Sequence, residues 1–98
     1  MTGWRQYYND SNYIVKYNKE LVNVIIHTGN ANVPTSWVGW HNILNDTSLR
    51  PSMPVSETDT SGSILIKASN NSPQITFKSI TGSAVSGQIY GELLWRKK

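Results

Sequence analysis

The sequence predicts an all-β fold, a single antiparallel β-sandwich or jelly-roll-like barrel of about seven or eight short strands. Apolar and polar residues alternate along most of the chain, and no window keeps the i, i+3, i+4, i+7 spacing of an amphipathic helix. Turn signals rich in Asn, Asp, Ser, Gly and Pro recur about every ten residues. The length of 98 residues predicts one domain, 1–98, and no internal repeat or linker is visible.

The first half of the chain predicts a strand followed by a hairpin, with strands over 4–8, 13–17 and 20–28. The last of these is the strongest, because Val22, Val24 and Ile26 fall on one face of the strand. A polar loop is expected over 29–36, where Pro34 bars a central strand. The segment 37–44 is strand-like but mixed in pattern, and 45–48 is a turn cluster.

The second half predicts an extended stretch, an edge strand, two alternating strands, a small-residue loop and a closing strand, over 50–54, 55–58, 63–68, 74–79, 81–87 and 88–95. The extended geometry follows from Pro51 and Pro54, which push their predecessors out of the helical region. The closing strand carries apolar side chains on both faces, with Tyr90 and Leu94 opposite the others. This pattern favours a strand that is covered by the core on one face and by a neighbouring subunit on the other.

Charge and composition exclude several classes of protein. The net charge of +3 comes from Arg96, Lys97 and Lys98, since the remaining six basic residues equal the six acidic ones. A nucleic-acid-binding role is not expected, because it needs a basic stripe. Because the chain has no cysteine, the sequence excludes a disulfide scaffold, a thiolate metal site and a cysteine nucleophile. No apolar run is long enough for a membrane-spanning helix, and Met1–Trp4 does not have the pattern of a signal peptide.

The segment Trp37–His41, together with Arg50 behind it, is the candidate binding site. A flat aromatic face stacks on a pyranose ring, and Trp37 or Trp40 supplies such a face unless it packs in the core. His41, Asp46 and Arg50 supply polar groups for hydroxyls, and the Arg50 guanidinium suits a phosphate on a polysaccharide. Ordinary roles compete: a loop histidine, a turn aspartate, and an arginine paired with a nearby carboxylate.

No catalytic residue, metal site or cofactor is predicted. Glu57 and Glu92 lie in no glycosidase motif, and the serines lack a nucleophile turn. Two distant histidines, His27 and His41, without nearby carboxylates give only weak support to a metal site. Glu57 and Asp59 suit sugar hydroxyls or calcium, or form a solvated edge, but the spacing of a calcium loop is absent.

The order of these features resembles the C-terminal receptor-binding head (tip) domain of receptor-binding and tail fibre proteins from phages of Gram-positive bacteria, lactococcal siphophages among them. The matching features are an opening Trp4, the hairpin over 13–28, a segment ending in Leu-Arg-Pro-Ser (44–52), a Gly-Ser-Ile-Leu-Ile strand (62–66), a shorter strand around Ile75–Phe77, and a closing Gly-x-Ile-x-Gly strand (87–91).

The resemblance implies a β-sandwich homotrimer that binds a saccharide of the host cell surface or wall without catalysis. It also implies a place on the virion, at the tail tip or baseplate, in contact with other tail proteins and facing outward. Such heads normally follow a shoulder and a neck, so the resemblance implies that this chain is either an excised head or a short gene product. Some lactococcal heads bind sugar with an aromatic, a His-x-Asp pair and an Arg, but His27 and His41 lack that Asp.

Three alternatives remain open on the sequence. A trimeric structural module of the virion would bind other virion proteins and no glycan. A cellular carbohydrate-binding module or lectin would use the same chemistry as a monomer. A nucleic-acid-binding barrel would show steep salt dependence, which the neutral body does not favour.

Overall fold

A computed structural model describes residues 3–98 and contains nine strands and one short 3-10 helix. These elements are β1 (Arg5–Asn9), β2 (Tyr13–Tyr17), β3 (Leu21–His27), β4 (Ala31–Val33), η1 (Thr47–Leu49), β5 (Val55–Thr58), β6 (Ile64–Ala68), β7 (Thr76–Ser79), β8 (Val85–Gly87) and β9 (Tyr90–Arg96). All strand pairs are antiparallel. The prediction of an all-β antiparallel sandwich is therefore confirmed. The expectation that Met1–Trp4 begins no signal peptide falls in part on Met1 and Thr2, which lie outside the described residues.

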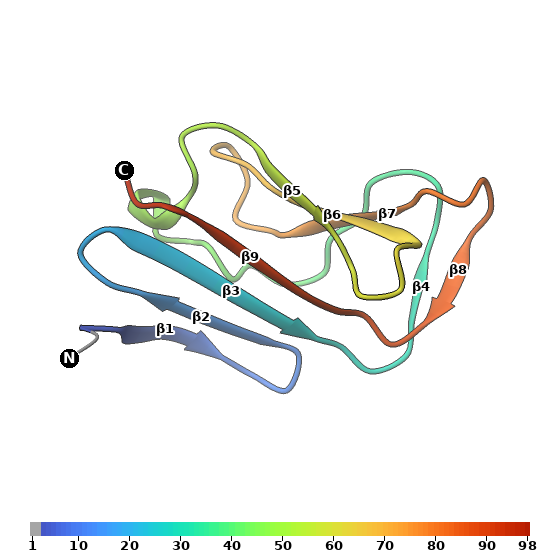
Figure 1. Cartoon of the computed structure of the whole chain (residues 1–98), viewed down its shortest axis with the longest axis horizontal. Helices are drawn as coiled ribbons and strands as arrows, with labels where there is room; N and C mark the ends of the chain where they lie inside the picture. The colour runs from blue at the N-terminus through green and yellow to red at the C-terminus, as the bar shows by residue number, and fades with distance from the viewer. Residues whose placement is uncertain (1–2) are drawn as a thin grey trace.

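One layer is a four-stranded sheet in the order β1-β2-β3-β9, whose strands run side by side in Figure 1. The register places Val24 of β3 between Val15 of β2 and Leu93 of β9, and all three are fully buried. The alternation in 20–28 therefore points its valines inward, as the sequence predicted. The last strand of the chain closes the sheet beside β3.

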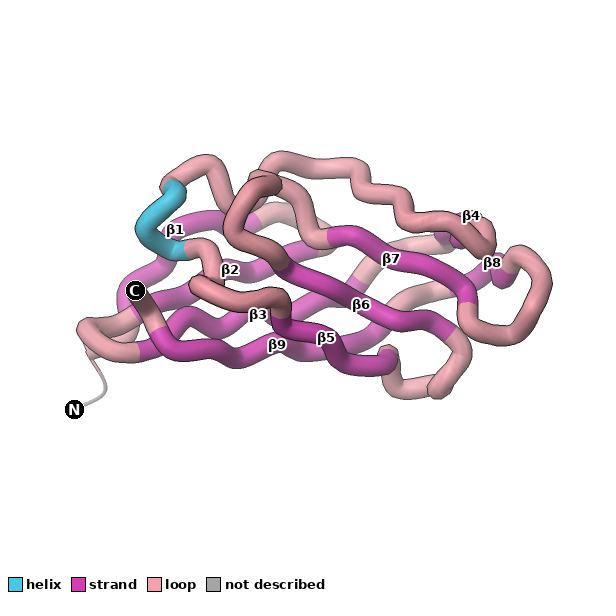
Figure 2. The backbone as a smooth tube through the Cα atoms, turned by 90° about the horizontal axis from the view of Figure 1, so that it is seen from above, coloured by secondary structure: helices cyan, strands magenta, loops and turns pink. Residues whose placement is uncertain are grey.

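The second layer is the sheet β5-β6-β7, which lies across the core from the first (Figures 1 and 2). The segment 37–44 continues this layer beyond β7 through two isolated bridges, Val38–Phe77 and Asn42–Gln74. The layers meet where the Thr60 N–H donates to the Tyr90 carbonyl at 2.8 Å. The pair β4–β8 closes one end of the sandwich.

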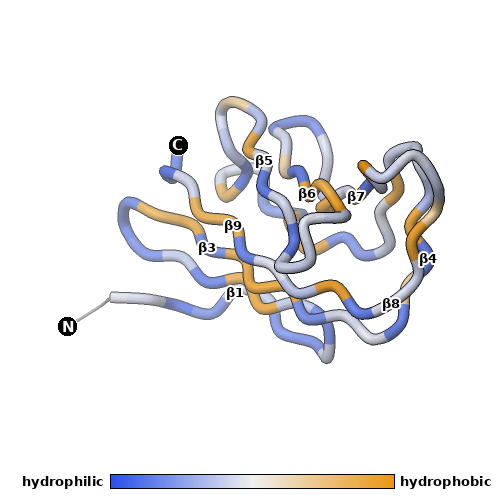
Figure 3. The backbone as a smooth tube through the Cα atoms, turned by 45° about the vertical axis from the view of Figure 1, so that its right-hand side comes forward, coloured by the Kyte–Doolittle hydropathy of each residue, from blue (hydrophilic) through white to orange (hydrophobic). Residues whose placement is uncertain are grey.

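The core lies between the layers and takes alternate residues from both. Figure 3 shows the hydrophobic stretches along the strands and the hydrophilic ones in turns and at the C-terminal end. Phe77 of β7 and Ile66 of β6 are fully buried. Gly91 on β9 lets Ile66 approach, because a Cβ there would lie 2.6 Å from Ile66 Cδ1.

The structure differs from the sequence-based predictions for two loops and one strand. The predicted loops 29–36 and 81–87 contain β4 and β8, which pair with each other. Each is only three residues long, too short for an alternation to be recognised. The strand-like 37–44 forms single bridges instead of a regular strand. The turn predicted over 45–48 is the start of η1, which Asp46 caps.

Candidate functional site

A groove of about 440 Å³ lies at the end of the sandwich where β2 begins and β3 ends. We call it the Trp40 groove, and it is lined by Asn12, Tyr13, Thr28, Gly29, Asn30, Ala31, Asn32, Trp40 and His41. These residues come from three separate stretches of the chain. The lining contains neither an acidic residue nor a lysine or arginine, so it is polar and uncharged apart from the histidine.

The first wall of the Trp40 groove is the turn between β1 and β2. Asp10 organises this turn, since its Oδ1 accepts from the backbone N–H groups of Asn12 and Tyr13, both at 2.7 Å. The Tyr8 hydroxyl donates to the other carboxylate oxygen, also at 2.7 Å. The carboxylate thus uses both oxygens to hold Asn12 and Tyr13 in place.

These bonds also set the charge of Asp10. Partial burial opposes ionisation, but the hydrogen bonds from Tyr8, Asn12 and Tyr13 and the nearby His41 outweigh it. The pKa of Asp10 is consequently below its usual value. Burial, together with the negative charge of Asp10, raises the pKa of the Tyr13 hydroxyl. At neutral pH the turn therefore holds a carboxylate beside a neutral phenol.

The second wall is the segment that carries Trp40. The indole is 42 % exposed, and its ring lies 5.2 Å from that of the buried Phe77, with the planes inclined by 33°. Gly39 lets this segment approach the chain just before β7 closely, because a Cβ at residue 39 would lie 3.0 Å from the Ile75 carbonyl oxygen. The fold thus holds an aromatic surface at the mouth of the groove.

Next to Trp40, the exposed His41 ring makes an edge contact with the Tyr13 ring at a centroid distance of 5.5 Å. The connection from β3 to β4 and the start of β4 supply the third wall. There the Asn32 side-chain oxygen accepts from the Ser86 hydroxyl at 3.2 Å. The side-chain amides of Asn12 and Asn30 form no hydrogen bond within residues 3–98, and both remain available to a ligand.

The structure brings together only Trp40 and His41 of the five residues proposed from the sequence. Trp37 lies outside the groove and packs against side chains of β6 and β7. The Nζ atoms of Lys67 and Lys78 lie 4.3 Å and 5.1 Å from its ring centroid. Its face is therefore engaged by two ammonium groups of the same chain.

Asp46 and Arg50 do not line the Trp40 groove either. Asp46 caps η1, since its Oδ1 accepts from the Ser48 N–H at 3.0 Å and hydroxyl at 2.7 Å. These bonds lower the pKa of Asp46. The Arg50 guanidinium donates to the Leu44 carbonyl at 2.8 Å and the Asn70 carbonyl at 3.3 Å. Both side chains thus shape the loop around η1.

The sequence analysis did not identify Asn12, Thr28, Asn30 and Asn32 as residues of the site. The run Gly29-Asn30-Ala31-Asn32 was interpreted as a polar loop, and Asn12 as a turn residue. The alternation of Asn30 and Asn32 about a small residue was the available signal. Their approach to Trp40 depends on contacts between distant parts of the chain, which no local pattern reveals.

The groove suits noncovalent recognition of hydroxyl groups by amides beside an aromatic face. Among residues 3–98, no group of three or more His, Asp or Glu side chains is placed to hold a metal ion. Within the same residues, no helix has the length and apolarity required to cross a bilayer. Comparisons of this chain with models of protein families, with curated proteins and with solved structures gave no match.

Proposed function

We propose that this chain binds a saccharide in the Trp40 groove without catalysis, as a receptor-binding head that attaches a phage to the surface of its host. The observation that carries the proposal is the exposed Trp40, which lies in one groove with His41 and three asparagines. A tryptophan face stacks on the C–H groups of a pyranose, and amides donate to and accept from its hydroxyls. The resemblance of the sequence to phage head domains supplies the biological setting.

The proposed setting includes a homotrimer at the tail tip or baseplate, in contact with other tail proteins and facing outward. The outer face of β9 supports self-association, because Leu94 is 54 % and Tyr90 38 % exposed there. Three weak sites that engage one cell surface together would give firm attachment through avidity. The molecular mass in solution tests the trimer, and Leu94→Glu is expected to shift it toward the monomer.

The test uses fluorescently labelled protein on a panel of Gram-positive cells and their extracted wall polysaccharides. Trp40→Ala is expected to abolish selective binding, since it removes the stacking face. Trp37→Ala is the matched control, because it deletes the same side chain outside the groove. Binding that survives in the Trp40 variant contradicts the assignment of the site.

The same exposed Leu94 and Tyr90 favour a second function, a structural module of the virion that binds other virion proteins and no glycan. The two functions differ in their response to Trp40→Ala. A structural module keeps its assembly with the partner protein in this variant and loses it in Leu94→Glu. Binding to no cell and no polysaccharide on the panel would favour this second function.

A further inference from the structure

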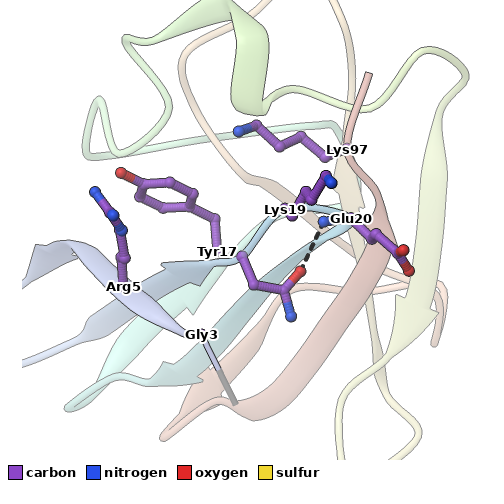
Figure 4. A pocket seen from close by; sticks show the side chains of 7 residues that line it. Gly3, Arg5, Tyr17, Lys19, Glu20 and Lys97 are labelled. Carbon is purple, nitrogen blue, oxygen red and sulfur yellow. Dashed lines mark hydrogen bonds between the residues drawn. The ribbon is translucent and has the colours of Figure 1, made fainter. Parts of the chain in front are cut away.

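A second pocket, of about 620 Å³, lies at the opposite end of the first sheet, where β1 begins and the chain ends. We call it the basic pocket, and it is lined by Gly3, Arg5, Tyr17, Asn18, Lys19, Glu20 and Lys97. Figure 4 shows Arg5, Lys19 and Lys97 around Tyr17, with the Glu20 carboxylate turned to the far side. We propose that this pocket binds a phosphate group, as a site separate from the Trp40 groove.

The backbone around the cations is held by hydrogen bonds. Arg5 pairs with Tyr17 across β1 and β2. The turn that carries Lys19 is fixed by Asn18, whose Oδ1 accepts from the N–H groups of Glu20 and Leu21, both at 2.8 Å. The three cations therefore start from ordered backbone positions.

Lys97 is attached to the same turn. Its backbone N–H donates to the Glu20 carbonyl at 2.7 Å, and its Nζ lies 5.0 Å from the Tyr17 ring centroid. This contact places the ammonium over the aromatic ring, on the side of the pocket where Figure 4 shows Arg5. The start of β1, the end of β2 with its following turn, and the chain after β9 thus line one pocket.

The charge of the lining calls for an anion. Three basic residues face one acidic residue, and none of the three forms an ion pair within residues 3–98. Asp46 lies outside the lining and also attracts Lys97 electrostatically, but it forms no ion pair with Lys97, and its Oδ1 is bonded to Ser48. The repulsion between the cations is relieved when an anion enters.

Phosphate fits this arrangement better than a carboxylate does. A phosphate monoester carries a charge of about −1.5 to −2 near neutral pH and offers three acceptor oxygens. Arginine binds such oxygens in a bidentate manner and lysine as a point charge. An extended nucleic acid is less suited, because the rest of the chain beyond Arg96–Lys98 has equal numbers of basic and acidic residues.

The experiment is an NMR titration of the ¹⁵N-labelled chain with inorganic phosphate and, separately, with glycerol 2-phosphate. The measured quantities are the chemical shifts of the backbone amides. We expect saturable shift changes at Tyr17, Lys19 and Lys97, with a Kd of about 1 mM or lower. The Lys19→Gln/Lys97→Gln variant should weaken binding at least about tenfold, since two charge-assisted contacts are lost. Lys78→Gln is the matched control, because it removes a lysine outside the pocket.

The two ligands distinguish the sources of the phosphate. Tighter binding of glycerol 2-phosphate indicates an organic ester as the natural ligand, and equal binding indicates the free ion. Shifts that do not saturate by about 10 mM, or that persist in the double variant, overturn the proposal. Stronger binding of a short single-stranded oligonucleotide, with shifts spread beyond the pocket, overturns it in favour of a nucleic-acid surface.

The test is independent of the saccharide proposal. Trp40→Ala should bind phosphate as the wild type does, because Trp40 does not line the basic pocket. Phosphate binding by this variant therefore separates the two proposals.

Discussion

The Trp40 indole rests on the ring of the buried Phe77, with centroids 5.2 Å apart and planes inclined by 33°. Phe77 is fully buried, whereas Trp40 is 42 % exposed, so one side chain anchors the other at the surface. The contact joins the core of the second sheet to the mouth of the Trp40 groove. Residues that support this contact are expected to affect both stability and ligand binding.

Phe77→Ala is expected to lower the free energy of unfolding by about 3–5 kcal/mol, because it leaves a cavity in the core. Urea unfolding measures this loss, and tryptophan emission reports the altered surroundings of Trp40. Ile80→Ala serves as control at a side chain that is 47 % exposed, where a change below about 0.5 kcal/mol is expected. Similar losses in both variants contradict the anchoring role.

Gly39→Ala is expected to lower the free energy of unfolding by about 1–3 kcal/mol, since the new methyl group crowds the two residues just before β7. A Cβ there would lie 2.8 Å from Gln74 Oε1 and 3.0 Å from the Ile75 backbone oxygen, and only the first can move away easily. Gly29→Ala is the matched control, because a Cβ at residue 29 has no atom within 4 Å. Urea midpoints that fall equally in the two variants would argue against the close approach.

The hydrogen bonds of Asp10 predict a dependence of stability on pH. Its pKa in the folded state is lowered, so its carboxylate stabilises the fold fully above the ordinary value for aspartate. This contribution is lost as the pH falls through the lowered pKa. Urea unfolding between pH 6 and pH 2, at about one-unit steps, should show a smaller acid-induced loss in Asp10→Asn than in the wild type.

The same substitution is expected to cost about 1 kcal/mol at neutral pH, because charge-assisted bonds from Tyr8 and the Asn12 and Tyr13 amides are weakened. Glu57→Gln is the control that removes one exposed carboxylate from β5. An acid profile for Asp10→Asn that coincides with the wild-type profile would count against this role.

The long alternating strands were predictable from the sequence, because a buried face repeats every second residue. Val22, Val24 and Ile26 point inward as expected, and Leu94 lies on the outer face of β9. The strands β4 and β8 were not predictable, since each is three residues long and depends on pairing with the other.

The site was predictable only where its residues are neighbours in the chain. Trp40 and His41 lie in one groove, but Asn12 and Asn30 reach it from the ends of other strands. Trp37 was proposed for the same site, but it lies three positions before Trp40 and its ring packs beside Lys67 of β6 instead. Which face a residue takes in an irregular segment depends on the neighbouring layer and not on local spacing.

Trp95→Phe is expected to lower the free energy of unfolding by about 1–3 kcal/mol, because it leaves the Leu49 carbonyl without its buried donor. The Trp95 Nε1–H donates to that oxygen at 2.8 Å and ties η1 to β9. Urea unfolding measures the loss, and faster amide exchange at Leu49 and Arg50 should locate it. Tyr90→Phe is the matched control, since its hydroxyl bond to Gln88 is exposed and should contribute less than about 0.5 kcal/mol. Equal losses in the two variants would mean that the buried bond to η1 contributes no more than an exposed one.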